Sequence, residues 1–196
     1  SIMTADGEVK TSKFTIGSKC KVFTEDGREV VPGSGEAGFI ARGGAVPLGY
    51  YKDPEKTEKT FKTINGVRYS VPGDWCTVEP DGTITLLGRG SNCINTAGEK
   101  VYPEEVEEAL KAHDAVKDAL VVGVPDDKWG QAITAVVSLD GQADEASLRE
   151  FVKTKLAHYK APKRVLFKDD LGRAVNGKAD YKSIKAFALA ELGIEA

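Results

Sequence analysis

The spacing of apolar residues changes near residue 94, and this change constrains the fold more than any other feature of the chain. Up to residue 88, the sequence consists of short β-rich runs separated by glycines. From residue 94 onward, apolar residues recur at helical spacing in some segments and form strand-like runs in others. The sequence therefore predicts two small domains that meet at residues 88–94.

The first half predicts a small antiparallel sheet or partial barrel. Asp-Gly pairs stand within two of its β-rich stretches, at residues 26–27 and 81–82. Such a pair between alternating apolar residues indicates a hairpin with a tight type I′ turn, in which both central residues have positive φ. Residues 52–61 (KDPEKTEKTF) are the segment of this half that we expect to form a short helix.

The second half predicts a compact α+β domain with a three-stranded sheet. Pro103 precedes four glutamates in five positions, which indicates a helix start, because proline suits the first turn and acidic side chains suit the positive end of the helix dipole. Val106, Leu110 and His113 then fall on one helical face. Strands are expected at 116–124, 131–139 and 163–170, and further helices at 144–159 and 181–192.

Composition limits the classes of function. The net charge is −3, with acidic and basic residues near balance in both halves, so neither nucleic acid nor an anionic membrane is indicated as a partner. No apolar run approaches the roughly 18 residues of a membrane span; membrane association is compatible with the sequence but not indicated by it. The first residues lack the basic start and apolar core of a signal peptide, and the three cysteines form no CxxC pair. We therefore expect a cytoplasmic protein with reduced thiols and, with only two distant histidines, no metal-ligand set.

Some short stretches carry residues suited to chemistry, and each also has a simpler structural explanation. Asp74 could bind a diol or cap a turn, and its spacing favours the turn. Arg89 could hold an anion or simply lie at the domain junction. Lys178 follows Asn-Gly in a loop, where a lone lysine is usually just exposed charge. The six basic residues of segment 153–168 could meet phosphates, although a solvated face is the commoner outcome.

Seven segments, in their order and at their distances, resemble the acyl-CoA synthetases of the acyl-adenylate-forming superfamily. They are GEAGFIARGGAVPLGYY, YSVPGDW, TITLLGR, GEKVYPEEVEEAL, VVGVPDDKWGQ, LAHYKAP and NGK. The resemblance covers essentially the whole chain, but the family's phosphate loop and its Tyr-Gly-x-Thr-Glu segment do not occur in it. It thus implies the C-terminal part of such an enzyme. Residues 1–88 resemble the last β subdomain of the large AMP-binding domain, 89–93 the hinge, and 94–196 the mobile C-terminal domain.

The resemblance also implies a reaction and roles for single residues. A fatty-acid–CoA ligase converts a carboxylic acid and ATP into an acyl adenylate, then transfers the acyl group to coenzyme A. By the family pattern, Asp74 accepts hydrogen bonds from the ribose hydroxyls, since a carboxylate has an oxygen for each. Arg89 holds the ribose or a neighbouring phosphate. Lys178 meets the carboxylate and α-phosphate oxygens as charge shifts during adenylation.

The second half-reaction is expected to use another part of the same domain. Gly98 and its neighbours Glu99 and Lys100 resemble the residues that line the pantetheine tunnel. Ser91 and Asn92 stand at the hinge, where many relatives have Lys-Asp, and Asn95 often corresponds to a lysine. Gly172 likewise stands where a proline is usual. These departures concern the hinge and its surroundings more than the class of reaction.

The expected partners follow from the same resemblance: the missing N-terminal domain, a carboxylic acid, ATP and coenzyme A. Mg²⁺ is expected to accompany ATP, with ligands outside this chain, and the isolated chain is expected to be inactive. Two alternatives stay open, an acyl-AMP ligase that serves a carrier protein and a non-catalytic interaction module. Asp74, Arg89 and Lys178 argue against the module, whereas the missing phosphate loop argues for it. The acyl chain length is not encoded in this part of the sequence.

Overall fold

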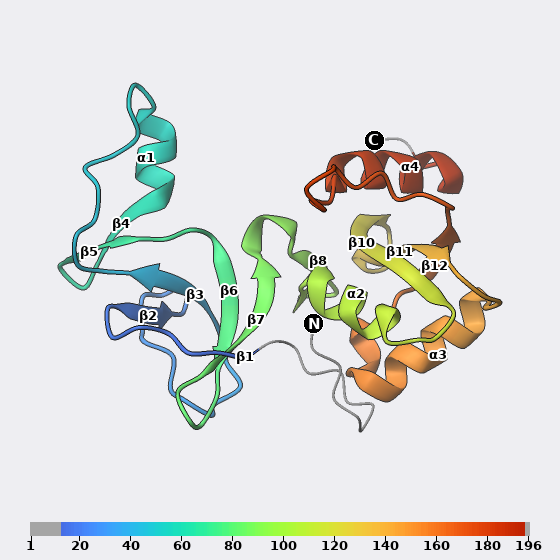
Figure 1. Ribbon diagram of the computed structural model, residues 1–196, viewed down its shortest axis with the longest axis horizontal. Coiled ribbons are helices and arrows are strands. Elements are labelled where there is room, and N and C mark those ends of the chain that lie inside the picture. Colours follow the sequence, from blue (N-terminus) through green and yellow to red (C-terminus); the bar gives the residue numbers. More distant parts are fainter. Residues whose placement is uncertain (1–12, 195–196) are drawn as a thin grey trace. The chain divides into compact units, whose positions relative to one another are not determined.

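A computed structural model describes residues 13–194, so the expectation about the first residues of the chain lies largely outside the described part. The contacts divide the chain into two compact units, the first ending at Ser91 and the second beginning at Asn92. Each unit is described by itself below, with the element labels of Figure 1.

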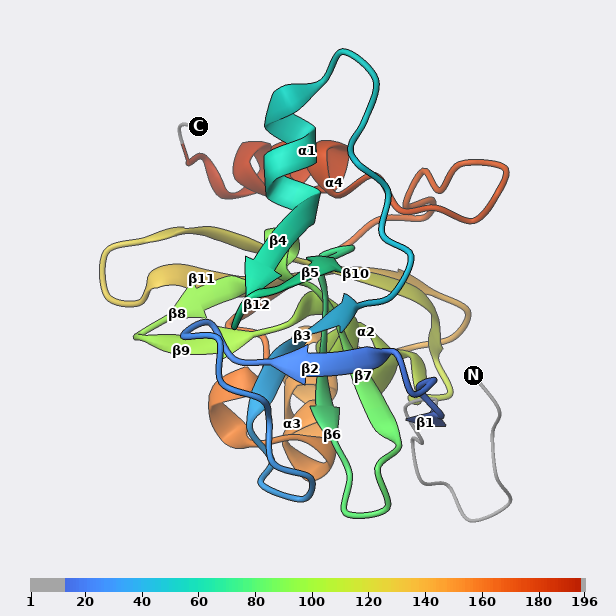
Figure 2. The same ribbon diagram turned by 90° about the vertical axis from the view of Figure 1, so that its left-hand side faces the viewer.

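The first unit is built on a seven-stranded antiparallel sheet, as the sequence predicts (Figure 2). The strand order is β1-β7-β6-β3-β5-β4, and β2 also pairs with β3. The predicted helix is present, and Asp53 caps it by accepting a hydrogen bond from the amide of Lys56. The elements are β1 Lys13–Phe14, β2 Cys20–Phe23, β3 Ala37–Arg42, α1 Pro54–Thr60, β4 Phe61–Ile64, β5 Val67–Ser70, β6 Asp74–Val78 and β7 Ile84–Arg89.

Both faces of this sheet bury apolar side chains. Val22 and Phe23 are adjacent on β2 and point to opposite faces, because side chains alternate along a strand. Val22 packs in a cluster with Cys76, whose thiol pKa is raised to about 12 by burial. Phe23 packs on the other face, edge-on to Tyr69. None of the three cysteines forms a disulfide.

The predicted type I′ turns at the two Asp-Gly pairs are wrong. Only Gly27 and Gly82 have positive φ there, at 83° and 80°, while both aspartates keep ordinary backbone angles. The loop at 79–83 instead closes with hydrogen bonds from Gly82 N to Glu79 O and from Glu79 N to Thr83 O. Two positive-φ residues in succession, as a type I′ turn requires, occur at 65–66 and at 97–98.

The second unit is an α+β structure with a five-stranded sheet of order β10-β11-β8-β9, in which β12 also pairs with β11. All pairings are antiparallel except β11 with β12, which is parallel. The 3₁₀ turn η1 Gly90–Asn92 spans the division between the units. The elements of the second unit are β8 Ile94–Thr96, β9 Glu99–Val101, α2 Pro103–Lys111, β10 Val116–Asp126, β11 Gly130–Leu139, α3 Glu145–Lys155, η2 His158–Lys160, β12 Arg164–Phe167 and α4 Tyr181–Leu192.

The two long strands of this sheet, β10 and β11, are covered on both faces (Figure 1). Ala119 and Val121 of β10 face α2 and α3, whereas Leu120 and Val122 face α4. Alternate residues of β11 are divided in the same way. This arrangement explains why both strands read as nearly continuous apolar runs.

The α+β class is confirmed, but three details of the predicted unit are wrong. The sheet has two more strands than the three predicted, because β8 and β9 join its edge. The helix expected at 144–159 ends at Lys155, since Leu156 is already extended. His113 lies beyond the end of α2, and its ring packs edge-on against Phe151 at 4.9 Å.

Candidate functional site

Asp74 and Arg89 are brought together at one end of the β6–β7 ladder. Cys76 pairs with Leu86, but Trp75 pairs with Gly88, so the register shifts by one residue at Leu87. This β-bulge makes Asp74 and Arg89 direct cross-strand partners. Arg89 Nε lies 3.2 Å from Asp74 Oδ1, and both side chains are accessible to solvent. An exposed pair of this kind adds only about 0–1 kcal/mol to folding stability, so the fold does not depend on it.

The first unit also contains a hollow with a volume of about 570 Å³, whose lining does not include Asp74 or Arg89 themselves. Its lining includes Gly73, Trp75, Gly90 and Ser91, which flank Asp74 and Arg89 in sequence. Gly90 is required here, because a Cβ at this position would lie 2.4 Å from the indole nitrogen of Trp75. The volume is within the range of small-molecule sites, and the aromatic ring of Phe39 forms part of the wall.

Gly98 lies at the tip of a two-residue hairpin between β8 and β9. Ala97 and Gly98 have φ values of 51° and 87°, the pattern of a type I′ turn. The amide of Ala97 donates to the carbonyl of Trp129, which ties the hairpin to the β10–β11 loop. A Cβ built at Gly98 meets no atom of the described residues within 4 Å, so this tip is open. Glu99 and Lys100 follow on β9 and are exposed.

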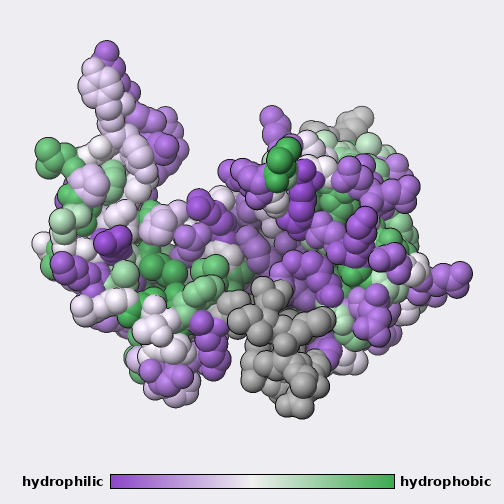
Figure 3. Space-filling view, in the orientation of Figure 1, coloured by the Kyte–Doolittle hydropathy of each residue, from purple (hydrophilic) through white to green (hydrophobic). Residues whose placement is uncertain are grey.

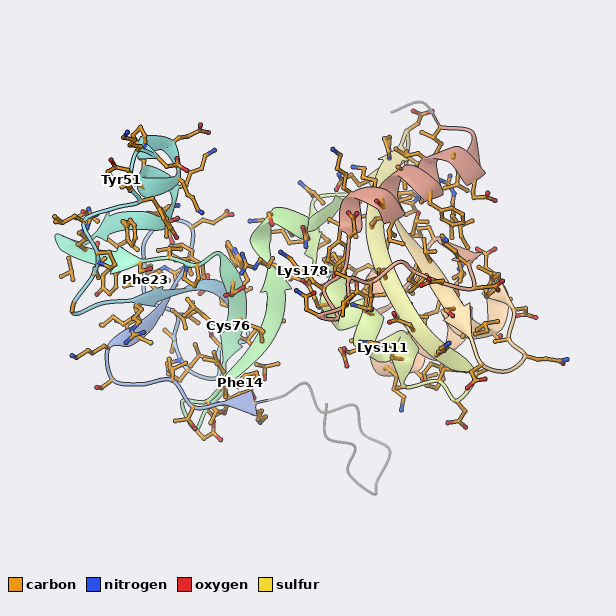
Figure 4. The ribbon with its side chains drawn as sticks, turned by 45° about the horizontal axis from the view of Figure 1, so that its top comes forward. Phe14, Phe23, Tyr51, Cys76, Lys111 and Lys178 are labelled. Atoms are coloured by element: carbon orange, nitrogen blue, oxygen red, sulfur yellow. The ribbon has the colours of Figure 1, made fainter. Side chains whose placement is uncertain are left out.

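Lys178 lies in the loop between β12 and α4 (Figure 4). The loop turns tightly at Gly177, whose φ is +77° and whose amide donates to Ala174 O at 2.7 Å. The amide of Lys178 donates to Asn176 Oδ1 at 3.1 Å. The Lys178 side chain is exposed, and its amine pairs with no group in residues 13–194. Lys178 belongs to the second unit, whereas Asp74 and Arg89 belong to the first.

The predicted hinge residues form part of a short 3₁₀ turn, η1, which includes Ser91 and Asn92. The assignment of 89–93 as a hinge stays a prediction, although the two units divide between these residues. Of the other departures, Gly172 has a φ of +67°, which proline cannot adopt. The backbone here therefore takes a path that the usual proline would exclude.

Sequence reasoning missed a buried carboxylate. Glu107 on α2 is only 4% exposed, although the sequence indicated no role for it beyond marking the helix start. Its Oε1 accepts the amide of Val121 at 2.9 Å, and both oxygens accept the hydroxyl of Tyr181, at 3.0 and 3.1 Å. Burial raises the pKa of Glu107 to about 7, against the opposing effect of these hydrogen bonds. The position of Glu107 at the border of the apolar helix face, three residues before Leu110, is the signal that could have revealed it.

All six lysine and arginine side chains of segment 153–168 have partners within the second unit. Lys153, Lys160 and Arg164 form ion pairs with Glu150, Glu105 and Asp126. The others lie over aromatic rings, at 4.6 Å in the pair Lys163–Trp129. These contacts favour the structural explanation of the segment over phosphate binding. On the face drawn in Figure 3, hydrophilic residues cover most of this unit.

The described residues offer neither a cluster suited to a metal ion nor a helix suited to a membrane. No group of three or more His, Cys, Asp or Glu side chains in residues 13–194 could hold a metal ion. Within the same residues, no helix combines the length and the apolar character needed to span a bilayer.

Comparison with known proteins identifies the class of domain. Residues 105–178 match the family described as AMP-binding enzyme C-terminal domain. The chain is 53% identical over 175 residues to a medium/long-chain-fatty-acid–CoA/3-oxocholest-4-en-26-oate–CoA ligase of Mycobacterium marinum. That match covers 88% of this chain but only 32% of the relative, so the chain spans about a third of the length of such relatives.

Solved structures agree with this class. ATP-bound MatB from Rhodopseudomonas palustris has a TM-score of 0.74 and 33% identity over 86% of this chain and 33% of its own. Amide bond synthetase McbA from Marinactinospora thermotolerans has a TM-score of 0.75 and 27% identity over 87% and 35%, respectively. The chain belongs to the acyl-adenylate-forming (AMP-binding) enzyme family. Within that family it is similar to the C-terminal part of the acyl-CoA synthetases.

Proposed function

We propose that this chain is the C-terminal part of a cytoplasmic, ATP-dependent fatty-acid–CoA ligase. The observation that carries the proposal is the 53% identity to an enzyme named for ligating fatty acids and a steroid carboxylate to coenzyme A. In the complete protein, a substrate carboxylate attacks the α-phosphorus of ATP and pyrophosphate leaves. The thiol of coenzyme A then attacks the acyl carbon, and AMP leaves.

The pair Asp74–Arg89 is proposed to hold the nucleotide. The carboxylate accepts both ribose hydroxyls, and the neighbouring guanidinium donates to the ribose or to a phosphate oxygen. Two features support this assignment: the bulge that aligns the two side chains, and the exposure of both. Because the ion pair adds little stability, exchange of its mutual contact for ligand contacts costs the fold little.

Lys178 is proposed as the residue that stabilises charge during adenylation. An amine on a tight, exposed turn is free to meet the carboxylate and α-phosphate oxygens once the rest of the enzyme encloses them. In a site closed to water, a cation aimed at developing negative charge is worth far more than the same cation in solvent.

Gly98 is proposed to face the pantetheine arm of coenzyme A, with Glu99 and Lys100 beside it. The open tip of its hairpin supports this role, because a thiol must approach the acyl adenylate closely. The two half-reactions then use different parts of the second unit, and we propose that it rotates about residues 89–93 between them.

The remaining two-thirds of the enzyme is the proposed partner of both units. It would supply the phosphate loop, the acyl pocket and the ligands of the Mg²⁺ that accompanies ATP. The acyl substrate is accordingly a fatty acid or a steroid carboxylate, a choice made outside this chain.

A second candidate function differs in the acyl acceptor. The structural similarity to an amide bond synthetase favours an acyl adenylate that is passed to an acceptor other than coenzyme A, such as an amine or a carrier-protein thiol. The test compares how fast the complete protein, supplied with ATP and a fatty acid, releases AMP with each acceptor. The proposal predicts rapid AMP release with coenzyme A and slow release with holo-carrier protein or an amine. The reverse order would contradict it.

A further inference from the structure

The turn that carries Lys178 is a small closed structure. The amide of Ala174 donates to Lys178 O at 3.0 Å, and the amide of Gly177 donates back to Ala174 O. Asn176 accepts the amide of Lys178 through its side chain. The turn is therefore ordered within itself, but these bonds alone do not fix its position relative to the rest of the unit.

Arg173 fixes one end of the turn to the sheet. Its Nε and Nη2 atoms donate to the two carboxylate oxygens of Asp118 on β10, at 2.6 and 2.9 Å. Its Nη1 atom donates to the carbonyl oxygen of Gly177 at 3.2 Å. One guanidinium thus joins the edge strand to the peptide group that precedes Lys178. Burial alone would raise the pKa of Asp118, but the hydrogen bonds and charge of Arg173 lower it below its usual value.

The other end of the segment is fixed to the same strand. Tyr181, the first residue of α4, donates to Glu107, and Glu107 in turn accepts the amide of Val121 on β10. Lys178 therefore lies between two anchors, Arg173 and Tyr181, that both lead to β10. The exposed turn is held by partly buried polar contacts on either side.

We propose that Arg173 is a positioning residue for adenylation, which holds Lys178 in place through its simultaneous contacts with Asp118 and the Gly177 carbonyl. This inference rests on the proposed function of Lys178. A lysine that must meet charge developing on a few oxygens gains from a backbone fixed in advance, because misplacement by about 1 Å can cost a hundredfold in rate. Loss of the clamp should slow adenylation on the order of tenfold and leave the thioester step unchanged.

The shape of the side chain makes the inference testable. A lysine at position 173 would keep the charge and could still pair with Asp118, but it lacks the planar fork that reaches a carboxylate and a carbonyl together. Arg173→Lys should therefore be slow in adenylation, nearly as slow as Arg173→Gln. If Arg173 acted only by stabilising the fold or by supplying a positive charge, Arg173→Lys would keep the original rate of adenylation.

Arg164 offers a matched control in the same unit. It also pairs with an aspartate of β10, Asp126, at 3.3 Å, but at the opposite end of that strand. Arg164→Gln removes an arginine–aspartate ion pair from the same strand without touching the turn. It should leave both half-reactions at their original rates.

The first experiment uses this chain alone and does not depend on its function. Amide ¹⁵N relaxation should show lower heteronuclear NOE values at Gly177 and Lys178 in Arg173→Gln and Arg173→Lys, and unchanged values in Arg164→Gln. Chemical shifts of β11 amides report whether each variant is folded. Unchanged order at Gly177 in a folded Arg173→Gln protein would overturn the inference.

The second experiment is a double-mutant cycle in the complete protein, read as the rate of acyl-adenylate formation. If Arg173 acts through Lys178, Arg173→Gln should have no further effect in a Lys178→Ala background. Additive effects, or a normal rate in Arg173→Gln beside a slow Lys178→Ala, overturn this inference and leave the proposed function standing. A normal rate in Lys178→Ala would instead overturn the assignment of Lys178, and the positioning role with it.

Discussion

Replacement of Glu107 by glutamine should stabilise the second unit at alkaline pH. Burial raises the pKa of Glu107 from an ordinary 4.5 to about 7. The folded state therefore binds this proton more tightly than the unfolded state, and wild-type stability falls as the pH rises from about 4.5 to about 7. A difference of 2.5 pKa units corresponds to about 3 kcal/mol. Glutamine has a similar shape and an oxygen that can accept the amide of Val121, but it does not ionise.

The assay is urea unfolding between pH 4.5 and 8, followed by tryptophan fluorescence. The chain has two tryptophans, and Trp75→Phe leaves Trp129 as the reporter of the second unit. The free energy of unfolding of Glu107→Gln minus that of the Glu107 parent should rise by about 3 kcal/mol from pH 4.5 to 8. Groups that titrate alike in the variant and in the parent contribute equally to both free energies, so their contributions cancel in this difference.

Two control variants distinguish ionisation from packing. Glu107→Ala should destabilise the unit at every pH, because it leaves the Val121 amide and the Tyr181 hydroxyl without their acceptor. Tyr181→Phe removes a hydrogen bond that lowers the pKa of Glu107, so the pH window should move upward. A difference between Glu107→Gln and its parent that stays constant with pH would refute the reasoning, since it would mean that Glu107 ionises near its ordinary pKa.

Three further predictions follow from the division of the chain and from its loops. The isolated chain should release no pyrophosphate above background from ATP and a range of fatty acids, and robust turnover would contradict the proposal that it is part of a larger enzyme. Residues 94–196, expressed alone, should give a dispersed amide NMR spectrum, because they contain two apolar clusters of their own; a collapsed spectrum would contradict the boundary. In the complete protein, Gly98→Leu should slow thioester formation and spare adenylation. Asparagine tolerates the φ of +87° better than leucine does. Gly98→Asn should therefore also slow thioester formation if the added side chain, and not backbone strain, causes the effect.

The long elements of the second unit could be predicted because several independent signals agree. Pro103 and the glutamates after it mark the start of α2, and α4 spans the predicted residues 181–192. Strands β10 and β11 are buried on both faces and so carry long apolar runs. Strands β8 and β9 have three residues each, too few for a period to be read. The Ala97–Gly98 turn between them has no Asn or Asp to announce it.

The geometry of the candidate site was less accessible to sequence reasoning. The family resemblance singled out Asp74 and Arg89, but the bulge at Leu87 that makes them partners has no sequence signal. The contacts of Arg173 depend on β10, more than fifty residues away in the chain. Long-range contacts of this kind are set by tertiary packing, which local patterns do not encode.

The rates of the two half-reactions in Lys178→Ala, measured separately in the complete protein, test the central claim most directly. Adenylation is followed as pyrophosphate release, and the thiol step as thioester formation from pre-made acyl adenylate. Lys178→Ala should slow adenylation by more than about a hundredfold, or on the order of 3 kcal/mol of transition-state stabilisation. It should change the thiol step much less, because the second unit has by then rotated. Equal slowing of both steps, or of neither, would contradict the account and leave Lys178 as an ordinary exposed loop residue.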